Sequence, residues 1–195
     1  MDRVNYVDLA TKHAALRDQL MDALGRVLDH GWFIGGPEVG QLETALAARL
    51  GLPHVITCNS GTDALLMALR LRGVGPGDEV IIPSHSFIAT GNAVLLLGAT
   101  PVFADIDDDT MVLDPARVAA AITARTRAVV AVHLNGYPSD LSEIHRVCDS
   151  RSIAVIEDCA QAFGATRAGR GVGQSGLGCF SFHPLKVLSA YGDGG

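Results

Sequence analysis

The chain lacks the features of membrane proteins and of nucleic-acid-binding proteins. No segment of its 195 residues approaches the roughly 20 consecutive apolar residues that a membrane-spanning helix needs. Basic residues are few, 15 Lys and Arg against 21 Asp and Glu, and the net charge of -6 argues against a nucleic-acid-binding surface. The first residues, 1–5, have neither the basic nor the apolar region of a signal peptide. We therefore expect a cytoplasmic protein with no nucleic-acid and no membrane partner.

Cysteine is also sparse, and its spacing excludes two common uses. The four cysteines are Cys58, Cys148, Cys159 and Cys179. No two of them have the CxxC spacing, and three lie in or beside apolar segments. Such cysteines behave as small buried hydrophobic residues in a reducing compartment. His85, His133 and His183 likewise share no metal-ligand spacing. We expect no disulfide framework and no metal site, and we interpret the three histidines as hydrogen-bonding side chains near a cleft.

Short apolar segments alternate with helical segments along most of the chain. Hydrophobic residues make up 48% of the sequence, enough for a substantial core. The predicted strands are 55–58, 79–82, 101–104, 128–132, 153–156 and 178–182, and the predicted helices are 9–28, 37–50, 62–71, 87–97, 115–122 and 141–148. The strands are continuously apolar, whereas an antiparallel α+β sheet would alternate in polarity. The pattern predicts an α/β fold of three layers, a mostly parallel sheet with helices on both faces. The loop 164–178, with six glycines, is expected to be the most flexible connection.

Polar side chains follow several of the predicted strands at the point where each strand ends. These polar segments are 59–63, 84–86, 133, 157–158 and 181–186. Because ligands of open parallel sheets bind beyond the carboxyl ends of the strands, we expect these side chains to share one cleft.

The segment Asn59-Ser60-Gly61-Thr62 has the composition of an anion-binding helix start. Gly61 would let the backbone approach an anion, and the hydroxyls of Ser60 and Thr62 could add donors to the free N–H groups of the helix. An ordinary Ser/Thr helix cap has the same composition and remains an alternative. Because no Walker lysine and no GxGxxG motif follows this strand, nucleoside triphosphates and dinucleotides are disfavoured.

Asp158 and Lys186 together suggest an enzyme that carries pyridoxal phosphate. An ionised Asp158 would keep the pyridine nitrogen of that cofactor protonated, and Gln161 could donate a hydrogen bond to the phenolic oxygen of the ring. Lys186 is the candidate nucleophile, since a cleft can depress a lysine pKa from its ordinary value near ~10.4. The alternatives are that Asp158 caps a helix and that Lys186 is a surface lysine, although apolar neighbours such as Leu185 make solvent exposure less natural. Phe87 either belongs to the core or stacks on the cofactor ring.

Several motifs occur in an order that is specific as a set. They are FIGGPEV at 33–39, NSGTDAL at 59–65, PSHSFIAT at 83–90, EDCAQA at 157–162, SFHPLK at 181–186 and GDGG at 192–195. With these motifs the chain resembles the DegT/DnrJ/EryC1/StrS sugar aminotransferases, a branch of the fold-type I pyridoxal phosphate enzymes. The resemblance implies a large domain like that of aspartate aminotransferase.

The resemblance also implies a cofactor, pyridoxal 5′-phosphate, and a role for each candidate residue. Lys186 would carry the cofactor as a Schiff base and shuttle the proton between the amino-acid and sugar carbons. Asp158 would pair with the pyridine nitrogen, and Gln161 would contact the ring oxygen. The remaining cofactor contacts would be Phe87, stacked on the ring, and Gly61, Thr62 and Ser181 at the phosphate.

The implied reaction moves an amino group, usually from glutamate, to a keto group of a nucleotide-linked deoxysugar. The implied partners are therefore a nucleotide-sugar and an amino acid, and full-length members are expected to form homodimers. Related dehydratases have histidine where the aminotransferases have lysine, so Lys186 favours transamination. Antibiotic, surface polysaccharide and aminocyclitol pathways all remain open.

The chain departs from the family pattern in two residues and in length. Asn135 follows His133-Leu134 where members commonly have tyrosine, and Cys159 stands where a small residue such as alanine is usual. Members are longer and continue into an antiparallel sheet strand and a small C-terminal domain. We therefore expect residues 1–195 to be an incomplete pyridoxal phosphate-binding large domain, without the small domain, and weakly active or inactive alone.

Two other functions remain open from the sequence. One is a truncated, catalytically silent cofactor-binding or interaction domain that another chain completes. The other is an unrelated doubly wound nucleotide-binding protein in which Lys186 is incidental.

Overall fold

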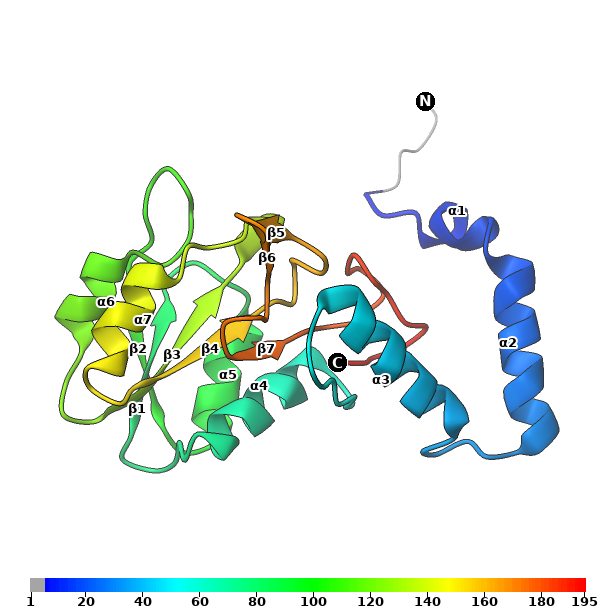
Figure 1. Ribbon diagram of the computed structural model, residues 1–195, viewed down its shortest axis with the longest axis horizontal. Helices are drawn as coiled ribbons and strands as arrows, with labels where there is room; N and C mark the ends of the chain where they lie inside the picture. The colour runs from blue at the N-terminus through cyan, green and yellow to red at the C-terminus, as the bar shows by residue number, and fades with distance from the viewer. Residues whose placement is uncertain (1–5) are drawn as a thin grey trace.

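The computed structural model describes residues 6–195, in which five parallel strands form one sheet with helices on both faces (Figure 1). The strand order is β2-β1-β3-β4-β7, and each neighbouring pair is parallel. The strands are β1 (Glu79–Pro83), β2 (Thr100–Ala104), β3 (Thr126–Val132), β4 (Ala154–Asp158) and β7 (Leu177–Cys179). The predicted three-layer α/β fold is confirmed.

Seven α-helices and one short 3-10 helix accompany the sheet in the described part of the chain. They are α1 (Leu9–Ala14), α2 (Arg17–His30), α3 (Pro37–Leu50), α4 (Gly61–Leu71), α5 (Ile88–Leu96), α6 (Pro115–Ala121), η1 (Leu134–Gly136) and α7 (Ser142–Asp149). Helices α4 and α5 cover one face of the sheet, and α6 and α7 cover the other.

The central strands contain uninterrupted apolar stretches because both faces of the sheet are covered. Successive strand residues point to opposite faces. Along β4, Ile156 belongs to the core beneath α4 and α5, whereas Val155 belongs to the core beneath α6 and α7. The same alternation directs Glu157 toward the α7 face and Asp158 toward the α4 face. Two adjacent acids therefore reach two different environments.

Two predicted elements differ from the structure: the helix 9–28 is confirmed in two parts, and the strand 55–58 was wrong. The predicted helix 9–28 is broken at Leu16, between α1 and α2. The segment 55–58 belongs to no sheet, because no strand among the described residues pairs along it. Among the described residues, Cys58 pairs with Gly195 through two backbone hydrogen bonds. The N–H of Cys58 donates to the carbonyl of Gly195 at 2.9 Å, and the N–H of Gly195 donates to the carbonyl of Cys58 at 3.1 Å.

The glycine-rich loop 164–178 contains regular structure that the sequence analysis missed. Strands β5 (Thr166–Arg167) and β6 (Arg170–Gly171) form a small antiparallel hairpin. Its two connecting residues, Ala168 and Gly169, have φ angles of 49° and 80°, which suit a tight hairpin turn. The loop expected to be most flexible is therefore folded back as a hairpin.

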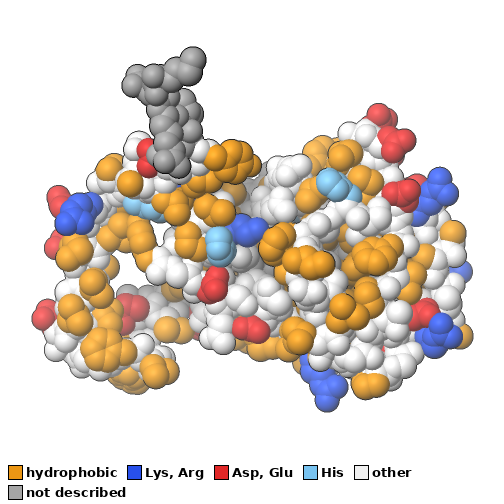
Figure 2. Space-filling model, turned by 180° about the vertical axis from the view of Figure 1, so that it is seen from behind, with side chains coloured by type: hydrophobic (Ala, Val, Ile, Leu, Met, Phe, Trp, Pro, Cys, Tyr) orange, Lys and Arg blue, Asp and Glu red, His pale blue; other side chains and the backbone are white. Residues whose placement is uncertain are grey.

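Helices α1 and α2 contribute no buried residue, and Figure 1 shows α2 standing to one side of the sheet. Leu24 and Leu28 on α2 are 51% and 58% exposed. In the reverse view of Figure 2, hydrophobic side chains gather over this part of the molecule, on the left. The apolar side of α2 is thus an open surface.

Between residues 6 and 195, no helix combines the length and the apolar character needed to cross a membrane. The prediction about a signal peptide concerns residues 1–5, which lie outside the described part of the chain. All four cysteines lie inside it and are free thiols.

Candidate active site

A cavity of about 720 Å³ lies at the carboxyl end of the sheet, between the strand ends and the start of α4. The structure brings all the predicted site residues into its wall: Gly61, Thr62, Phe87, Asp158, Gln161, Ser181 and Lys186. They come from separate parts of the sequence and meet because the parallel strands end at the same edge.

Asp158 ends β4 and is 5% exposed, at the base of the cavity. Its Oδ2 accepts a hydrogen bond from the hydroxyl of Thr90 at 2.8 Å, and its Oδ1 accepts one from the backbone N–H of Ala160 at 3.1 Å. Burial raises the pKa of Asp158, while these hydrogen bonds and the nearby charge of Lys186 oppose that rise. No helix follows β4, so the interpretation of Asp158 as a helix cap was wrong.

Lys186 lies in a turn after β7, closed by a hydrogen bond from its N–H to the carbonyl of His183 at 2.8 Å. Its side chain is half-buried and lines the cavity, so the surface-lysine alternative was wrong. The Lys186 ammonium lies 5.9 Å from the centroid of the Phe87 ring. The amine and the Asp158 carboxylate thus face the same space.

Phe87 precedes α5 and is 64% exposed, with its ring in the cavity wall. The alternative that Phe87 belongs to the core was therefore wrong. An exposed aromatic ring in a cavity wall offers a flat apolar surface on which another ring can stack.

The start of α4 forms another part of the cavity wall. Its sequence was interpreted either as a helix cap or as an anion-binding helix start, and the structure is compatible with both. The Ser60 side chain caps the helix by accepting a hydrogen bond from the N–H of Asp63 at 3.1 Å. Gly61 is buried, and a Cβ atom there would lie 2.7 Å from the Cβ of Ser181. Glycine is thus needed for the close approach of α4 to the chain after β7. Free N–H groups of the first turn lie beside Thr62 and Ser181 in the cavity wall.

Thr90 is a site residue that the sequence analysis missed. It is 2% exposed and lies on α5, three residues after Phe87 and four after Ser86. Its hydroxyl is also 3.3 Å from that of Ser86. Residues three and four apart share one helix face, so the helical spacing from Phe87 was the available signal.

The three histidines occupy different environments. His183 lines the cavity, where its Nδ1 accepts a hydrogen bond from the N–H of Leu185 at 3.2 Å. His85 is exposed and does not line it. His133 was expected near the cleft as a hydrogen-bonding side chain; it does form hydrogen bonds, but it is buried on the opposite face of the sheet, because it continues the side-chain alternation that places Val129 and Ala131 there. The prediction was wrong for His85 and His133.

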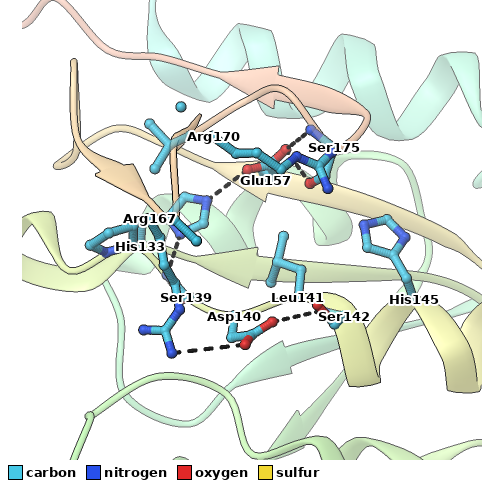
Figure 3. Close-up of a pocket in the computed structure, with 14 residues that line it drawn as sticks. His133, Ser139, Asp140, Leu141, Ser142, His145, Glu157, Arg167, Arg170 and Ser175 are labelled. Atoms are coloured by element: carbon cyan, nitrogen blue, oxygen red, sulfur yellow. Dashed lines mark hydrogen bonds and ion pairs between the residues drawn. The ribbon is translucent and has the colours of Figure 1, made fainter.

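A second cavity, of about 410 Å³, lies on that opposite face between α7 and the β5–β6 hairpin (Figure 3). Glu157 lies in its wall and accepts hydrogen bonds from His133 Nε2 at 2.9 Å, from the N–H of Gly173 at 2.8 Å, and from the N–H and hydroxyl of Ser175 at 2.8 and 2.6 Å. Burial alone would raise the pKa of Glu157, but these hydrogen bonds lower it to about 2. Glu157 therefore anchors the glycine-rich segment as a carboxylate.

Each charged group of the second cavity has a hydrogen-bond or ion-pair partner within the protein; that of Arg170 is the carbonyl of Gln174, at 3.4 Å. Arg167 lies 3.8 Å from Asp140 at its rim, and Glu157 is bonded to His133 at its base. Figure 3 shows both pairs across the cavity from each other. This arrangement is typical of a structural network and leaves little net charge for a ligand.

His133, Glu157 and Cys159 place ligand atoms within 4.8 Å of one another, but their hydrogen bonds disfavour a metal ion. His133 Nδ1 accepts a hydrogen bond from the N–H of Ser139 at 3.0 Å, so the neutral ring carries its proton on Nε2, the atom that faces Glu157. Burial raises the pKa of the Cys159 thiol well above its ordinary value, and a protonated thiol is a poor ligand. The three residues form a hydrogen-bonded network.

Comparison with known proteins places the chain among aminotransferases. Residues 14–195 match the profile of the DegT/DnrJ/EryC1/StrS aminotransferase family. A UDP-N-acetyl-3-dehydro-alpha-D-glucosamine 3-aminotransferase of Acidithiobacillus ferrooxidans is 50% identical over 190 residues, which cover 97% of this chain and 52% of that protein.

Solved structures show the same fold. DesV of S. venezuelae is similar with a TM-score of 0.92 and 43% identity, over 100% of this chain and 53% of that one. NtdA of Bacillus subtilis, with bound cofactor PMP, is similar with a TM-score of 0.93 and 34% identity, over 100% of this chain and 44% of that one. The chain spans about half the length of the relatives it matches.

Proposed function

The chain belongs to the DegT/DnrJ/EryC1/StrS aminotransferase family, and from this premise we propose that residues 1–195 form the pyridoxal phosphate-binding large domain of a sugar aminotransferase. The reaction is the transfer of an amino group from an amino acid, glutamate in this proposal, to a keto group of a nucleotide-linked deoxysugar. One observation carries the proposal: the buried Asp158 carboxylate and the Lys186 amine face a single cavity.

The residues of the cavity fit pyridoxal 5′-phosphate. A buried carboxylate is costly without a cationic partner, and a protonated pyridine nitrogen would be that partner for Asp158. The N-terminus of α4, with Thr62 and Ser181, offers donors for a phosphate, and Phe87 offers a surface for the ring. When bound, this cofactor supplies an electron sink for the carbanion that forms at the amino-acid carbon.

The side chains divide the work of such a reaction. Lys186 would hold the cofactor covalently through Nζ and, when released, would carry a proton at the same atom. The Thr90 hydroxyl would help Asp158 to keep its negative charge beside the cofactor. Phe87 would orient the ring and limit the access of water to one of its faces.

The names of the relatives support the proposed substrates, and the exposed side of α2 and the free thiols support the proposed assembly and cellular location. The Acidithiobacillus relative is named for a UDP-linked 3-dehydro sugar, which supports a nucleotide-linked keto sugar as the amino acceptor and a pathway of polysaccharide or antibiotic biosynthesis. The exposed apolar side of α2 supports a homodimer. Four free thiols support a reducing, cytoplasmic setting.

A second candidate function is that of a cofactor-binding or interaction domain without catalysis of its own. In that alternative, residues 1–195 bind the cofactor but need another chain for turnover. Cofactor binding without transamination by the purified chain would favour this alternative.

Covalent labelling tests the cofactor assignment sharply because the chain contains two lysines, Lys12 and Lys186. Purified protein is incubated with pyridoxal 5′-phosphate, reduced with borohydride, digested and analysed by mass spectrometry. We expect a visible absorption band and a stable adduct on Lys186, absent from Lys186→Ala and retained in the matched variant Lys12→Arg. An adduct confined to Lys12, or none at all, would refute the proposal.

A further inference from the structure

The turn that follows β3 has a backbone geometry that few sequences adopt. Asn135 has φ 52° and ψ 22°, and Gly136 has φ 83°. The N–H of Tyr137 donates to the carbonyl of Leu134 at 2.9 Å and closes the turn. Two successive left-handed residues define a type I′ turn, for which Asn-Gly is the preferred pair. Asn135 and Gly136 therefore dictate this local structure.

The turn directs the backbone N–H of Asn135 to the side chain of Gln161, at 3.0 Å from Oε1. A backbone N–H can only donate, so the side-chain atom that it contacts is the amide oxygen. The amide nitrogen of Gln161 is then the free end of the side chain, and no acceptor among residues 6–195 engages it. Both residues line the cavity of Asp158 and Lys186.

A buried hydrogen-bond network on the opposite face of the sheet stabilises the residues that flank this turn. His133, directly before the turn, accepts a hydrogen bond at Nδ1 from the N–H of Ser139 and donates from Nε2 to Glu157. The hydroxyl of Ser139 donates to the carbonyl of Val132 at 3.3 Å. Figure 3 shows His133 between Glu157 and Ser139. The residues before and after the turn are thus fixed by the network that β4 anchors on the opposite face of the sheet.

We propose that the Leu134–Tyr137 turn, held by the His133–Glu157 pair, is a positioning unit that fixes Gln161 with its amide N–H groups toward the cavity. Asn135 is its positioning residue, and it acts through its backbone N–H. Gln161 therefore presents donors to the ligand and disfavours a ligand that also donates. The ligand group that fits is an anionic oxygen; its identification as the ring oxygen of pyridoxal phosphate rests on the proposed function.

The first test needs no cofactor. Hydrogen exchange of the Asn135 amide is measured by NMR in the wild type, Gln161→Glu and Gln161→Leu. A carboxylate still accepts the bond and leucine cannot, so we expect protection in the wild type and Gln161→Glu and exchange about tenfold faster in Gln161→Leu. Equal exchange in Gln161→Leu and the wild type would overturn the inference.

The second test uses the cofactor-loaded protein and the pH at which its visible band changes. A donor to the ring oxygen stabilises the deprotonated, more anionic form of the cofactor–lysine chromophore, so loss of the donor raises the chromophore pKa. We expect Asn135→Val, which disfavours a positive φ, to raise that pKa by about one unit, and Asn135→Gly to leave it within about 0.3 units of the wild type.

Gln161→Leu removes the donor without adding a charge, so it should raise the chromophore pKa even if Asn135→Val fails to fold. The titratable groups that line the cavity are unchanged in Gln161→Leu, Asn135→Val and Asn135→Gly; they are Asp158, His183, Lys186 and Asp193. If the wild type shows the band and both Gln161→Leu and Asn135→Val keep the wild-type chromophore pKa, this inference alone is overturned. No band in the wild type would overturn the proposed function and this inference with it.

Discussion

Glu157 and Asp158 are neighbours on β4, yet their acidities are shifted in opposite directions. Burial acts on both, and the number of donors decides the outcome. Glu157 accepts four hydrogen bonds, and its pKa falls to about 2. Asp158 accepts two from the protein, and its pKa is raised. Hydrogen bonds from the protein thus stabilise the charged form of Glu157 fully. For Asp158, the two hydrogen bonds do not offset the effect of burial on its pKa.

Glu157 should make the stability of the fold dependent on acid pH. Its folded pKa of about 2 lies below its ordinary value of 4.5, so its contribution is present above 4.5 and is lost as the pH falls toward 2. The difference corresponds to about 3 kcal/mol at ~1.4 kcal/mol per pH unit. Denaturant unfolding of the wild type and Glu157→Gln at about pH 3 and about pH 7 measures it. Glu157→Gln should be less stable at neutral pH by roughly 1–3 kcal/mol and lose the acid dependence. Parallel stability curves for the two proteins would contradict this assignment.

Thr90 should keep Asp158 ionised over a wider pH range. Its hydroxyl opposes the rise of the Asp158 pKa that burial causes, so Thr90→Val should raise that pKa further and shift ionisation to higher pH. We expect cofactor affinity to fall about tenfold, most at acid pH, since a hydrogen bond to a charged group is lost. Absorbance titrations at about pH 5 and about pH 8 check this, with Thr90→Ser, which retains the hydroxyl, as the control. An equal loss in both variants would instead indicate a packing defect.

Most of the predicted site residues could be found because they follow a strand at one edge of a parallel sheet; Gly61 and Thr62 instead follow the segment 55–58, which belongs to no sheet. The side of the sheet was harder to predict, and His133 illustrates why. His133 lies just beyond the predicted strand 128–132, and only its position two residues after Ala131, which faces α6 and α7, indicates the side that it takes. Thr90 was missed because its partner Asp158 is 68 residues away along the chain; the helical spacing from Phe87 indicates that Thr90 lies beside the cleft but does not identify that partner.

At the scale of single elements, the first residues of α4 have two roles: Ser60 caps the helix, and the same segment lines the cavity. Ser60 caps α4, and Asp114 caps α6, which lies away from the cavity, by accepting a hydrogen bond from the N–H of Ala116 at 2.8 Å. We expect Ser60→Ala and Asp114→Ala each to reduce the free energy of unfolding by about 1 kcal/mol. Ser60→Ala alone should also weaken cofactor binding, because it loosens the N–H groups beside Thr62. Calorimetric melting and cofactor titration of both variants separate the two effects, and equal cofactor affinities would argue against an anion site at this helix start.

The elements that the sequence predicted well are those whose stability comes from burial on both faces. Strands β1, β3 and β4 each contain an uninterrupted apolar stretch, 80–83, 128–132 and 154–156, that is almost entirely buried. The segment 55–58 has the composition of a strand, but a strand also needs a neighbour, which composition does not supply. The hairpin at 166–171 was missed because its strands are two residues long and polar.

At the scale of the whole molecule, the sheet and the N-terminal helices differ in how firmly they are held. The side chains of α1 and α2 are not buried, and α1 is tied to the segment after Lys186 by Lys12, whose Nζ donates to the carbonyl of Lys186 at 3.1 Å and to the hydroxyl of Ser189 at 3.2 Å. At low protein concentration we expect rapid hydrogen exchange in α1 and α2 and slow exchange in β1, β3 and β4.

Lys12→Met should speed exchange in α1 further and leave the sheet unchanged, whereas Arg117→Met, a change on the far side of the sheet, should affect neither. Mass-spectrometric hydrogen exchange resolves these segments. Protection of α2 equal to that of the sheet would show that its apolar side is covered in solution, and a dependence of that protection on dilution would assign the cover to another copy of the chain.

The pairing of β4 with β3 aligns Glu157 with Ala131 and Asp158 with Val132. Because side chains alternate, a slip of this alignment by one position would exchange the two acids, bringing the wrong carboxylate to each side. The chemistry of the cavity therefore depends on the register of the Glu157-Asp158 pair in the sheet as well as on its presence. An insertion or deletion of one residue near 150–153 should abolish cofactor binding even where the overall fold is retained.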